Sequence, residues 1–234
     1  MKLGKALAVI GVLCLTLALL VSCTGGPNSV PEPVTPVTRL DVSVGTPPPE
    51  GWRWVVAEIN TGADEVREAA AAHGFFWIFY VVKGSTEISM GGLTTVAFAG
   101  EGIMVPARQQ HTHRDLPQSK ILAFDVRSAN DTPDAFHRGT RLLLSNKLEL
   151  AASPGFKVRI QEITLSPGQR MPETSVADPS FVYVVEGTLT TRTGDSTATI
   201  EVAKASELAL RATYGMSNDN TAAPLRFLLI AVHT

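Results

Sequence analysis

The stretch that decides the fold is residues 100–115, which read GEGIMVPARQQHTHRD. Its glycines give the backbone freedom to turn, and the apolar residues 103–105 form a short strand. Pro106 ends that strand because it has no N–H to donate to a neighbouring strand. Two histidines, His111 and His113, follow after the turn. The stretch therefore predicts a strand and a turn that lead into a pair of histidines.

The spacing within this stretch resembles the second motif of the cupin family. That motif has a glycine, five residues, a proline, one residue, a glycine, two residues, a histidine, three residues and an asparagine. Gly100, Pro106 and His111 stand at this spacing, whereas Arg108 takes the place of the second glycine and Asp115 that of the asparagine. The resemblance implies a small antiparallel β-barrel of jelly-roll type.

An internal repeat decides the architecture. Tyr-Val-Val-x-Gly occurs twice, ending at Gly84 and at Gly187, and reads as a strand that enters a tight turn. The distance from Glu58 to Gly84 is 26 positions, and that from Glu162 to Gly187 is 25. We therefore predict an all-β fold with two jelly-roll cupin-type antiparallel barrels in tandem, as in a bicupin. They cover residues 52–126 and, in degenerate form, 158–234.

The segment between the barrels, residues 127–157, contains an apolar run at 142–150. This run is compatible with a short helix or with a strand that packs between the barrels. Before the first barrel, residues 23–51 are rich in Pro, Gly, Ser and Thr and predict an extended tether. Within the tether, residues 38–44 alternate well enough to add as an edge strand to a downstream sheet.

The cupin resemblance also implies a divalent metal, held by two histidines and a glutamate of the first motif and the histidine of the second. Counted back from Gly84, the glutamate position holds Trp77, the second histidine position His73 and the first Ala71. Only His73 and His111 remain, and a catalytic zinc or iron site normally needs three protein ligands. We expect no cofactor; any metal would be a single Zn, Ni, Fe or Cu ion in the N-terminal barrel.

His113 is the candidate third ligand, because residues two apart in a strand project to the same face. We favour an exposed turn for it, since a loop histidine more often contacts water than metal. His73 also has another interpretation. Residues 64–74 read as a short helix with Asp64 as N-cap and Gly74 after its end, which places His73 at the helix C-terminus.

Ligand pockets are predicted in both barrels. Trp77 and Phe79 share the strand face that points into the first barrel, where they fill much of the metal's space or stack on a sugar or aromatic acid. The second copy lacks all the family's metal ligands. Thr174, Ser180 and Met216, together with Val176, occupy those positions and line a pocket for an apolar or mixed small molecule, or form part of a packed core.

The N-terminus predicts export. Residues 1–22 carry two lysines and then a short apolar run, which is typical of a signal peptide. They end in LVSC, residues 20–23, which resembles the lipobox of bacterial lipoproteins and implies that Cys23 is lipidated. We therefore expect a protein of the cell envelope that is held at a membrane surface through Cys23. Cys14 falls in the removed segment, so no disulfide is expected.

Composition excludes one further class of function. The 234 residues include 20 basic and 22 acidic ones, and no like-charge run occurs. A nucleic-acid-binding protein would show a basic patch or stripe, so we expect no nucleic acid as a partner. Two functions stay open. The first is a non-catalytic small-molecule-binding or scaffold lipoprotein, and the alternative is a metal-dependent oxygenase, decarboxylase or sugar isomerase with its site in the N-terminal barrel.

Overall fold

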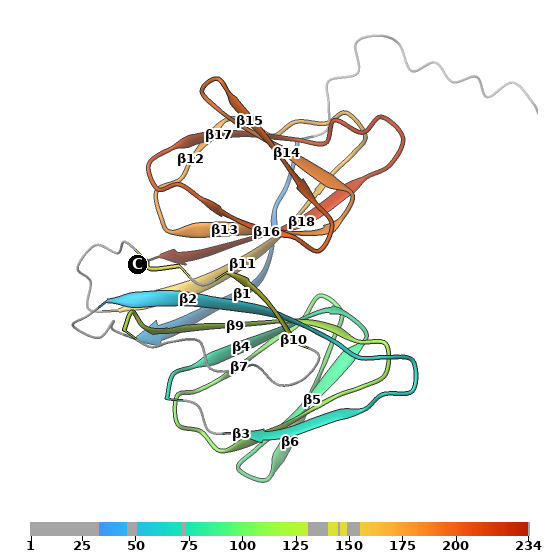
Figure 1. The fold of residues 1–234 in the computed structure, drawn as a ribbon, viewed down its shortest axis with the longest axis vertical. Helices are drawn as coiled ribbons and strands as arrows, with labels where there is room; N and C mark the ends of the chain where they lie inside the picture. Colours follow the sequence, from blue (N-terminus) through green and yellow to red (C-terminus); the bar gives the residue numbers. More distant parts are fainter. Residues whose placement is uncertain are drawn as a thin grey trace, which may run out of the picture. The chain divides into compact units, whose positions relative to one another are not determined.

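The computed structural model describes residues 33–45, 51–71, 74–130, 140–144, 146–148 and 155–233, and its regular elements are all strands (Figure 1). Val34–Thr234 forms one compact unit. The signal segment 1–22, Cys23 and His73 lie outside the described residues. Within the residues that are described, no helix has the length and apolar character to cross a membrane.

The N-terminal half is built from two antiparallel sheets, with strand orders β10-β2-β9-β4-β7 and β3-β8-β5-β6. Its strands are β2 (Trp52–Asn60), β3 (Arg67–Ala71), β4 (Trp77–Lys83), β5 (Ser85–Met90), β6 (Leu93–Phe98), β7 (Gly102–Val105), β8 (His111–Asp115), β9 (Lys120–Ser128) and β10 (Thr140–Leu144).

The C-terminal half repeats this plan, with strand orders β1-β11-β18-β13-β16 and β12-β17-β14-β15. Its strands are β1 (Val37–Gly45), β11 (Phe156–Leu165), β12 (Thr174–Ser175), β13 (Ser180–Glu186), β14 (Thr188–Thr193), β15 (Ser196–Glu201), β16 (Ala205–Leu208), β17 (Thr213–Ser217) and β18 (Leu225–His233). The predicted all-β fold of two tandem jelly-roll barrels is confirmed.

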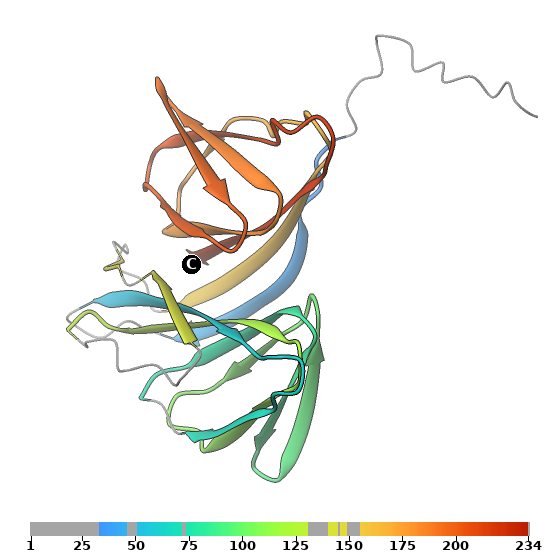
Figure 2. The same cartoon turned by 45° about the vertical axis from the view of Figure 1, so that its right-hand side comes forward.

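Each half contributes one strand to the sheet of the other half. β1 precedes the N-terminal barrel in sequence but pairs with β11 of the C-terminal barrel, beside which it runs in Figure 2. β10 precedes the C-terminal barrel but pairs with β2 of the N-terminal barrel. The edge strand predicted at residues 38–44 is therefore confirmed, and the part of the apolar run that lies in β10 is a strand. Both exchanged strands tie the halves together.

Among the described residues, three apolar clusters form the core. The interior of the N-terminal barrel holds Ile59, Trp77, Phe79, Ile88, Val105, Ile121 and Ala123. The interior of the C-terminal barrel holds Ile163, Leu165, Val176, Val182, Val184, Leu189, Ile200, Leu208, Met216, Leu225 and Phe227. The third and largest cluster joins the two halves, with Trp54 packed edge-on against Phe181 at 5.1 Å between ring centroids. Each fully buried large side chain contributes about 1.5–3 kcal/mol, so this shared cluster makes the halves one folding unit.

The helix predicted for residues 64–74 is wrong. Residues 67–71 form β3, which pairs with β8 so that Ala71 lies opposite His111. Alanine favours a helix only weakly, by tenths of a kcal/mol per residue, whereas pairing with β8 gives this segment backbone hydrogen bonds and a place in the barrel wall. Tertiary pairing therefore overrides the local cap-and-glycine signal.

The repeated glycine of Tyr-Val-Val-x-Gly is required by close packing. Gly84 has φ +76°, and a Cβ there would lie 2.5 Å from Ser119 Oγ. Gly187 has φ +81°, and its Cβ would lie 2.9 Å from the carbonyl oxygen of Pro224. Both the left-handed backbone and the lack of space exclude a side chain, which explains why the motif occurs in both halves.

Candidate functional site

β8 directs three polar side chains into the N-terminal barrel. His111, His113 and Asp115 alternate along this strand and are 4 %, 4 % and 0 % exposed. The exposed turn that we favoured for His113 is therefore wrong. β8 is an inner strand of its sheet, between β3 and β5, so residues two apart along it share the buried face.

These three side chains contact the segment before β8, the neighbouring strand β5 and one another. His111 Nδ1 lies 3.0 Å from the carbonyl oxygen of Gln109, and Asp115 accepts a hydrogen bond of 2.8 Å from the hydroxyl of Thr86. His113 Nδ1 lies 3.6 Å from the Asp115 carboxylate. Burial lowers the pKa of His111 below the ordinary histidine value, and the contact with Gln109 only partly opposes this shift. His111 is thus neutral at pH 7.

A ladder of rings runs from the start of β4 to the two histidines. Trp77 stacks on Phe79 at 5.8 Å between centroids, with 23° between the ring planes. Phe79 lies 5.3 Å from His113, and His113 stacks on His111 at 6.3 Å. The prediction that Trp77 and Phe79 share the inner face is confirmed, because both belong to the interior cluster. The ladder fills the centre of this barrel with aromatic side chains.

Sequence reasoning missed a buried ion pair beside Trp77. Asp125 pairs across the sheet with Trp77, and Arg53 pairs with Arg127, so these side chains lie on the same inner face. Arg127 Nε donates to the Asp125 carboxylate at 2.8 Å, and both residues are buried. The detectable signal was Asp125 directly after the apolar run 121–124, with Arg127 two positions further along the strand, since a buried carboxylate needs a partner.

The described residues do not by themselves fit the metal that the cupin fold implies. Trp77 and Ala71 stand in two of the four ligand positions, and neither an indole nor a methyl group supplies a lone pair that coordinates a metal ion. No three His, Asp, Glu or Cys side chains among the described residues are grouped so that they could hold an ion. His73, the remaining first-motif candidate, lies outside those residues.

The pocket residues predicted for the C-terminal barrel lie in three different environments. Thr174 is exposed on β12 and donates to the carbonyl of Pro172 at 3.0 Å. Ser180 is buried at the start of β13 and donates to the carbonyl of Asp178 at 2.7 Å. Met216 is buried in the apolar interior cluster together with Val176. Of these residues, the structure thus places Met216 and Val176 in one group.

The strand register corrects the alignment of the second motif in the C-terminal half. Ile88, four positions after Gly84, pairs with His113, and Thr191, four positions after Gly187, pairs with Met216. Met216 therefore corresponds to His113 rather than to His111. The turns agree with this register. Arg108, where the motif has its second glycine, has φ 61°, and Arg211 has φ 64°.

These observations define a bicupin fold, two jelly-roll barrels in tandem with an exchanged edge strand in each. Solved structures of the same fold support this at low sequence identity. AerE from Microcystis aeruginosa aligns with a TM-score of 0.56 and 11% identity, over 86% of this chain and 98% of AerE. YhaK from Escherichia coli aligns with a TM-score of 0.54 and 15% identity, over 84% of this chain and 94% of YhaK. Oxalate decarboxylase from Bacillus subtilis aligns with a TM-score of 0.53 and 12% identity, over 87% of this chain and 77% of the decarboxylase.

No protein-family model and no curated protein sequence matches this chain. The likeness to AerE, YhaK and oxalate decarboxylase therefore establishes the fold alone.

Proposed function

We propose that this protein is an exported, lipid-anchored binding or scaffold protein of the cell envelope that binds a small molecule at the Trp77 end of the N-terminal barrel. The observation that carries the proposal is the ladder of Trp77, Phe79 and His113, with the Asp125–Arg127 pair beside it. This combination sets a flat indole ring beside fixed charges, and flat rings and fixed charges are the features that orient a ring-shaped ligand.

The ligand class follows from these groups. An aromatic ring stacks on sugars and on other aromatic rings, and a guanidinium recognises a carboxylate or hydroxyl group. Asp125 accepts a hydrogen bond from Arg127, which fixes the orientation of the guanidinium group. A monosaccharide or an aromatic carboxylic acid fits this chemistry. Binding without catalysis is favoured, because Trp77 replaces the carboxylate that a cupin metal site needs.

The experiment measures thermal stability and intrinsic tryptophan fluorescence with a panel of monosaccharides and aromatic carboxylic acids. We expect one class to raise the melting temperature, and we expect Trp77→Leu to abolish the effect. Ser180→Ala is the matched control, because Ser180 holds the equivalent position in the C-terminal barrel. Loss of binding in Ser180→Ala with retention in Trp77→Leu would place the ligand in the other barrel and refute the assignment.

The cellular part of the proposal rests on the N-terminal sequence. A diacylated or triacylated Cys23 holds a protein stably at a membrane, whereas a single chain is marginal. Metabolic labelling with a fatty-acid analogue tests this directly. The parent chain should incorporate the label and Cys23→Ala should not, and equal labelling of both would exclude the anchor.

One observation favours the metal-enzyme alternative, an oxygenase, decarboxylase or sugar isomerase. His111 and His113 both face the barrel interior, so with His73 they would supply three imidazoles. The oxalate decarboxylase of Bacillus subtilis, which shares the fold, has Mn(II) centres. Elemental analysis of protein purified without chelator decides between the functions. A bound metal, and a Zn-, Ni- or Fe-dependent rise in melting temperature that both His73→Ala and His111→Ala abolish, would favour the enzyme.

A further inference from the structure

β6 is an edge strand with an unusual apolar surface. It ends the sheet β3-β8-β5-β6, and β5 is its one strand partner among the residues that the structure describes. Its residues Leu93, Val96 and Phe98 are 77 %, 40 % and 59 % exposed. The strand sequence, LTTVAF, contains no charge and no proline. Natural edge strands usually carry a charged residue or a proline, which prevents pairing with a strand of another chain. β6 has neither.

The backbone of β6 presents unpaired groups along its free edge. Phe98 donates its N–H to the Glu101 carboxylate, and its carbonyl accepts from the Glu101 N–H, so both groups point away from β5. Residues two apart in a strand direct their backbone groups to the same side. Thr94 and Val96 therefore direct their N–H and C=O groups outward as well. Within the described part of the chain, none of these four groups, the N–H and C=O of Thr94 and Val96, forms a backbone hydrogen bond outside the strand pairing with β5.

The other half of the molecule supplies an internal comparison. β15 holds the same place as β6, because Leu93 pairs with Met90 just as Ser196 pairs with Thr193. By this register, Leu93, Val96 and Phe98 correspond to Ser196, Thr199 and Glu201. The same edge of the same fold is thus polar in one half and apolar in the other, so the fold itself does not demand apolar residues there.

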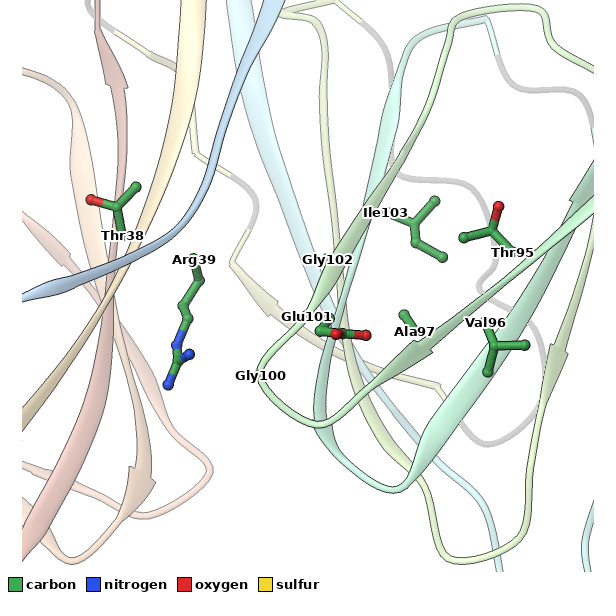
Figure 3. Close-up of a pocket in the computed structure, with 9 residues that line it drawn as sticks. All are labelled: Thr38, Arg39, Thr95, Val96, Ala97, Gly100, Glu101, Gly102 and Ile103. Atoms are coloured by element: carbon green, nitrogen blue, oxygen red, sulfur yellow. The ribbon is translucent and has the colours of Figure 1, made fainter.

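A groove runs along the free edge of β6. It has a volume of about 440 Å³ and is lined by residues of β6, of the turn after it, of the start of β7 and of β1 (Figure 3). Figure 3 shows Val96 and Ala97 on one side and Arg39 on the other. The groove leaves space beside the outward-pointing backbone groups of β6, as the arrival of another strand requires.

We propose that β6 pairs antiparallel with β6 of a second copy of this chain, about a two-fold axis at Thr95. In this register, Thr94 of each copy lies opposite Val96 of the other copy. The N–H and C=O groups of both residues, which point outward in each copy, then become hydrogen-bonded across the dimer. Phe98 keeps its contacts with Glu101. The two four-stranded sheets join into one continuous sheet across the dimer.

Charge favours a second copy as the occupant. A two-fold axis brings each strand against its own sequence, so any charged residue would face a like charge nearby. β6 carries none, whereas β15 carries Glu201. On the outer face beside Val96, Glu87 is neutralised by Arg114 at 3.0 Å, so the flanking surface adds no net repulsion.

The contact is small, which sets the expected strength. One strand pair with its flanking side chains falls below the roughly 1,200 Å² that stable interfaces bury, so the dimer is weak in solution. A lipid anchor, which belongs to the proposed function, would raise the effective concentration at a membrane surface. The solution tests below do not depend on that anchor.

The first test is a cross-link at the two-fold axis. In the proposed register, Thr95 faces Thr95 of the other copy at about 4.5–5.5 Å between Cβ atoms, close to disulfide distance. Thr95→Cys, in a chain with Cys14→Ala and Cys23→Ala, should form a covalent dimer under mild oxidation. Ala198→Cys at the equivalent position of β15 is the control and should stay largely monomeric. Equal cross-linking of the two variants would overturn the proposal.

The second test is sedimentation velocity at increasing protein concentration, on the chain that carries Cys14→Ala and Cys23→Ala and keeps Thr95. Val96→Pro removes one of the outward N–H groups, and proline is tolerated at an edge position of this kind. The dimer should weaken at least about tenfold in Val96→Pro and remain in Thr199→Pro, the matched change in β15. A monomer up to roughly 1 mM, or a dimer that Val96→Pro does not weaken, would refute the pairing.

Discussion

Replacing Tyr183 by phenylalanine should destabilise the junction between the barrels. Its hydroxyl donates to the carboxylate of Glu58, which belongs to the other half of the chain and is only 3 % exposed. Asn60 Nδ2 and an Arg141 N–H also donate to Glu58, at 2.8 and 3.0 Å. Although burial alone would raise the pKa of Glu58, the donors, Tyr183 first among them, bring it below the usual range. The hydroxyl thus binds an ionised, buried acceptor.

The magnitude follows from the acceptor's charge and its remaining partners. A hydrogen bond to a charged group is worth about 1.5–3 kcal/mol, and Glu58 retains other donors in the variant, so Tyr183→Phe should cost about 2 kcal/mol. Tyr80 provides the internal comparison. Its hydroxyl reaches Glu162 of the C-terminal half at 3.3 Å, and Arg39 Nε already donates to that carboxylate at 2.9 Å. Tyr80→Phe should therefore cost only about 1 kcal/mol.

The assay is urea unfolding at pH 7, supported by thermal unfolding. Tyr183→Phe should lower the melting temperature by about 4–8 °C. The Glu58→Gln change and the double variant complete a cycle that isolates the coupling energy. Burial and Glu58 raise the pKa of Tyr183, so its contribution should persist below pH 10 and fade as the pH rises above it. Equal losses for Tyr183→Phe and Tyr80→Phe, or a coupling near zero, would contradict the reasoning.

Three further predictions concern the fold. Gly84→Ala should cost at least about 2 kcal/mol in urea unfolding, because it adds a clash with Ser119 to the left-handed penalty. Gly91→Ala, with open space around it, should cost about 1 kcal/mol, and an equal loss would disprove the steric argument. Because burial lowers the pKa of His111, its contribution to stability is present above pH 6.5 and is lost as the pH falls below that value. Urea midpoints measured from pH 7.5 to pH 5 should therefore fall with pH in the parent chain and fall less in His111→Gln. A chain that starts at Gly51 should melt lower than the parent, since it lacks β1, and an unchanged melting temperature would show that this strand contributes nothing.

The sequence by itself determined the features that depend on local chemistry and on repetition. The glycine of Tyr-Val-Val-x-Gly marks a left-handed position, the repeat implies one unit used twice, and alternation identifies strands. Trp77 and Phe79 could be placed inside the barrel, because a strand directs every second residue to the same face. These inferences need only neighbouring residues and the two-residue period of a strand.

Only the tertiary structure decided which strands meet. Residues 67–71 carry a helix signal but become β3 through pairing with β8, and the same sheet buries His113. The ion pair of Asp125 with Arg127 lies beside Trp77 because β9 pairs with β4, and β1 crosses to the other half. Each outcome depends on partners far away in the sequence, and their pairing energy exceeds the small local preferences that a sequence pattern reports.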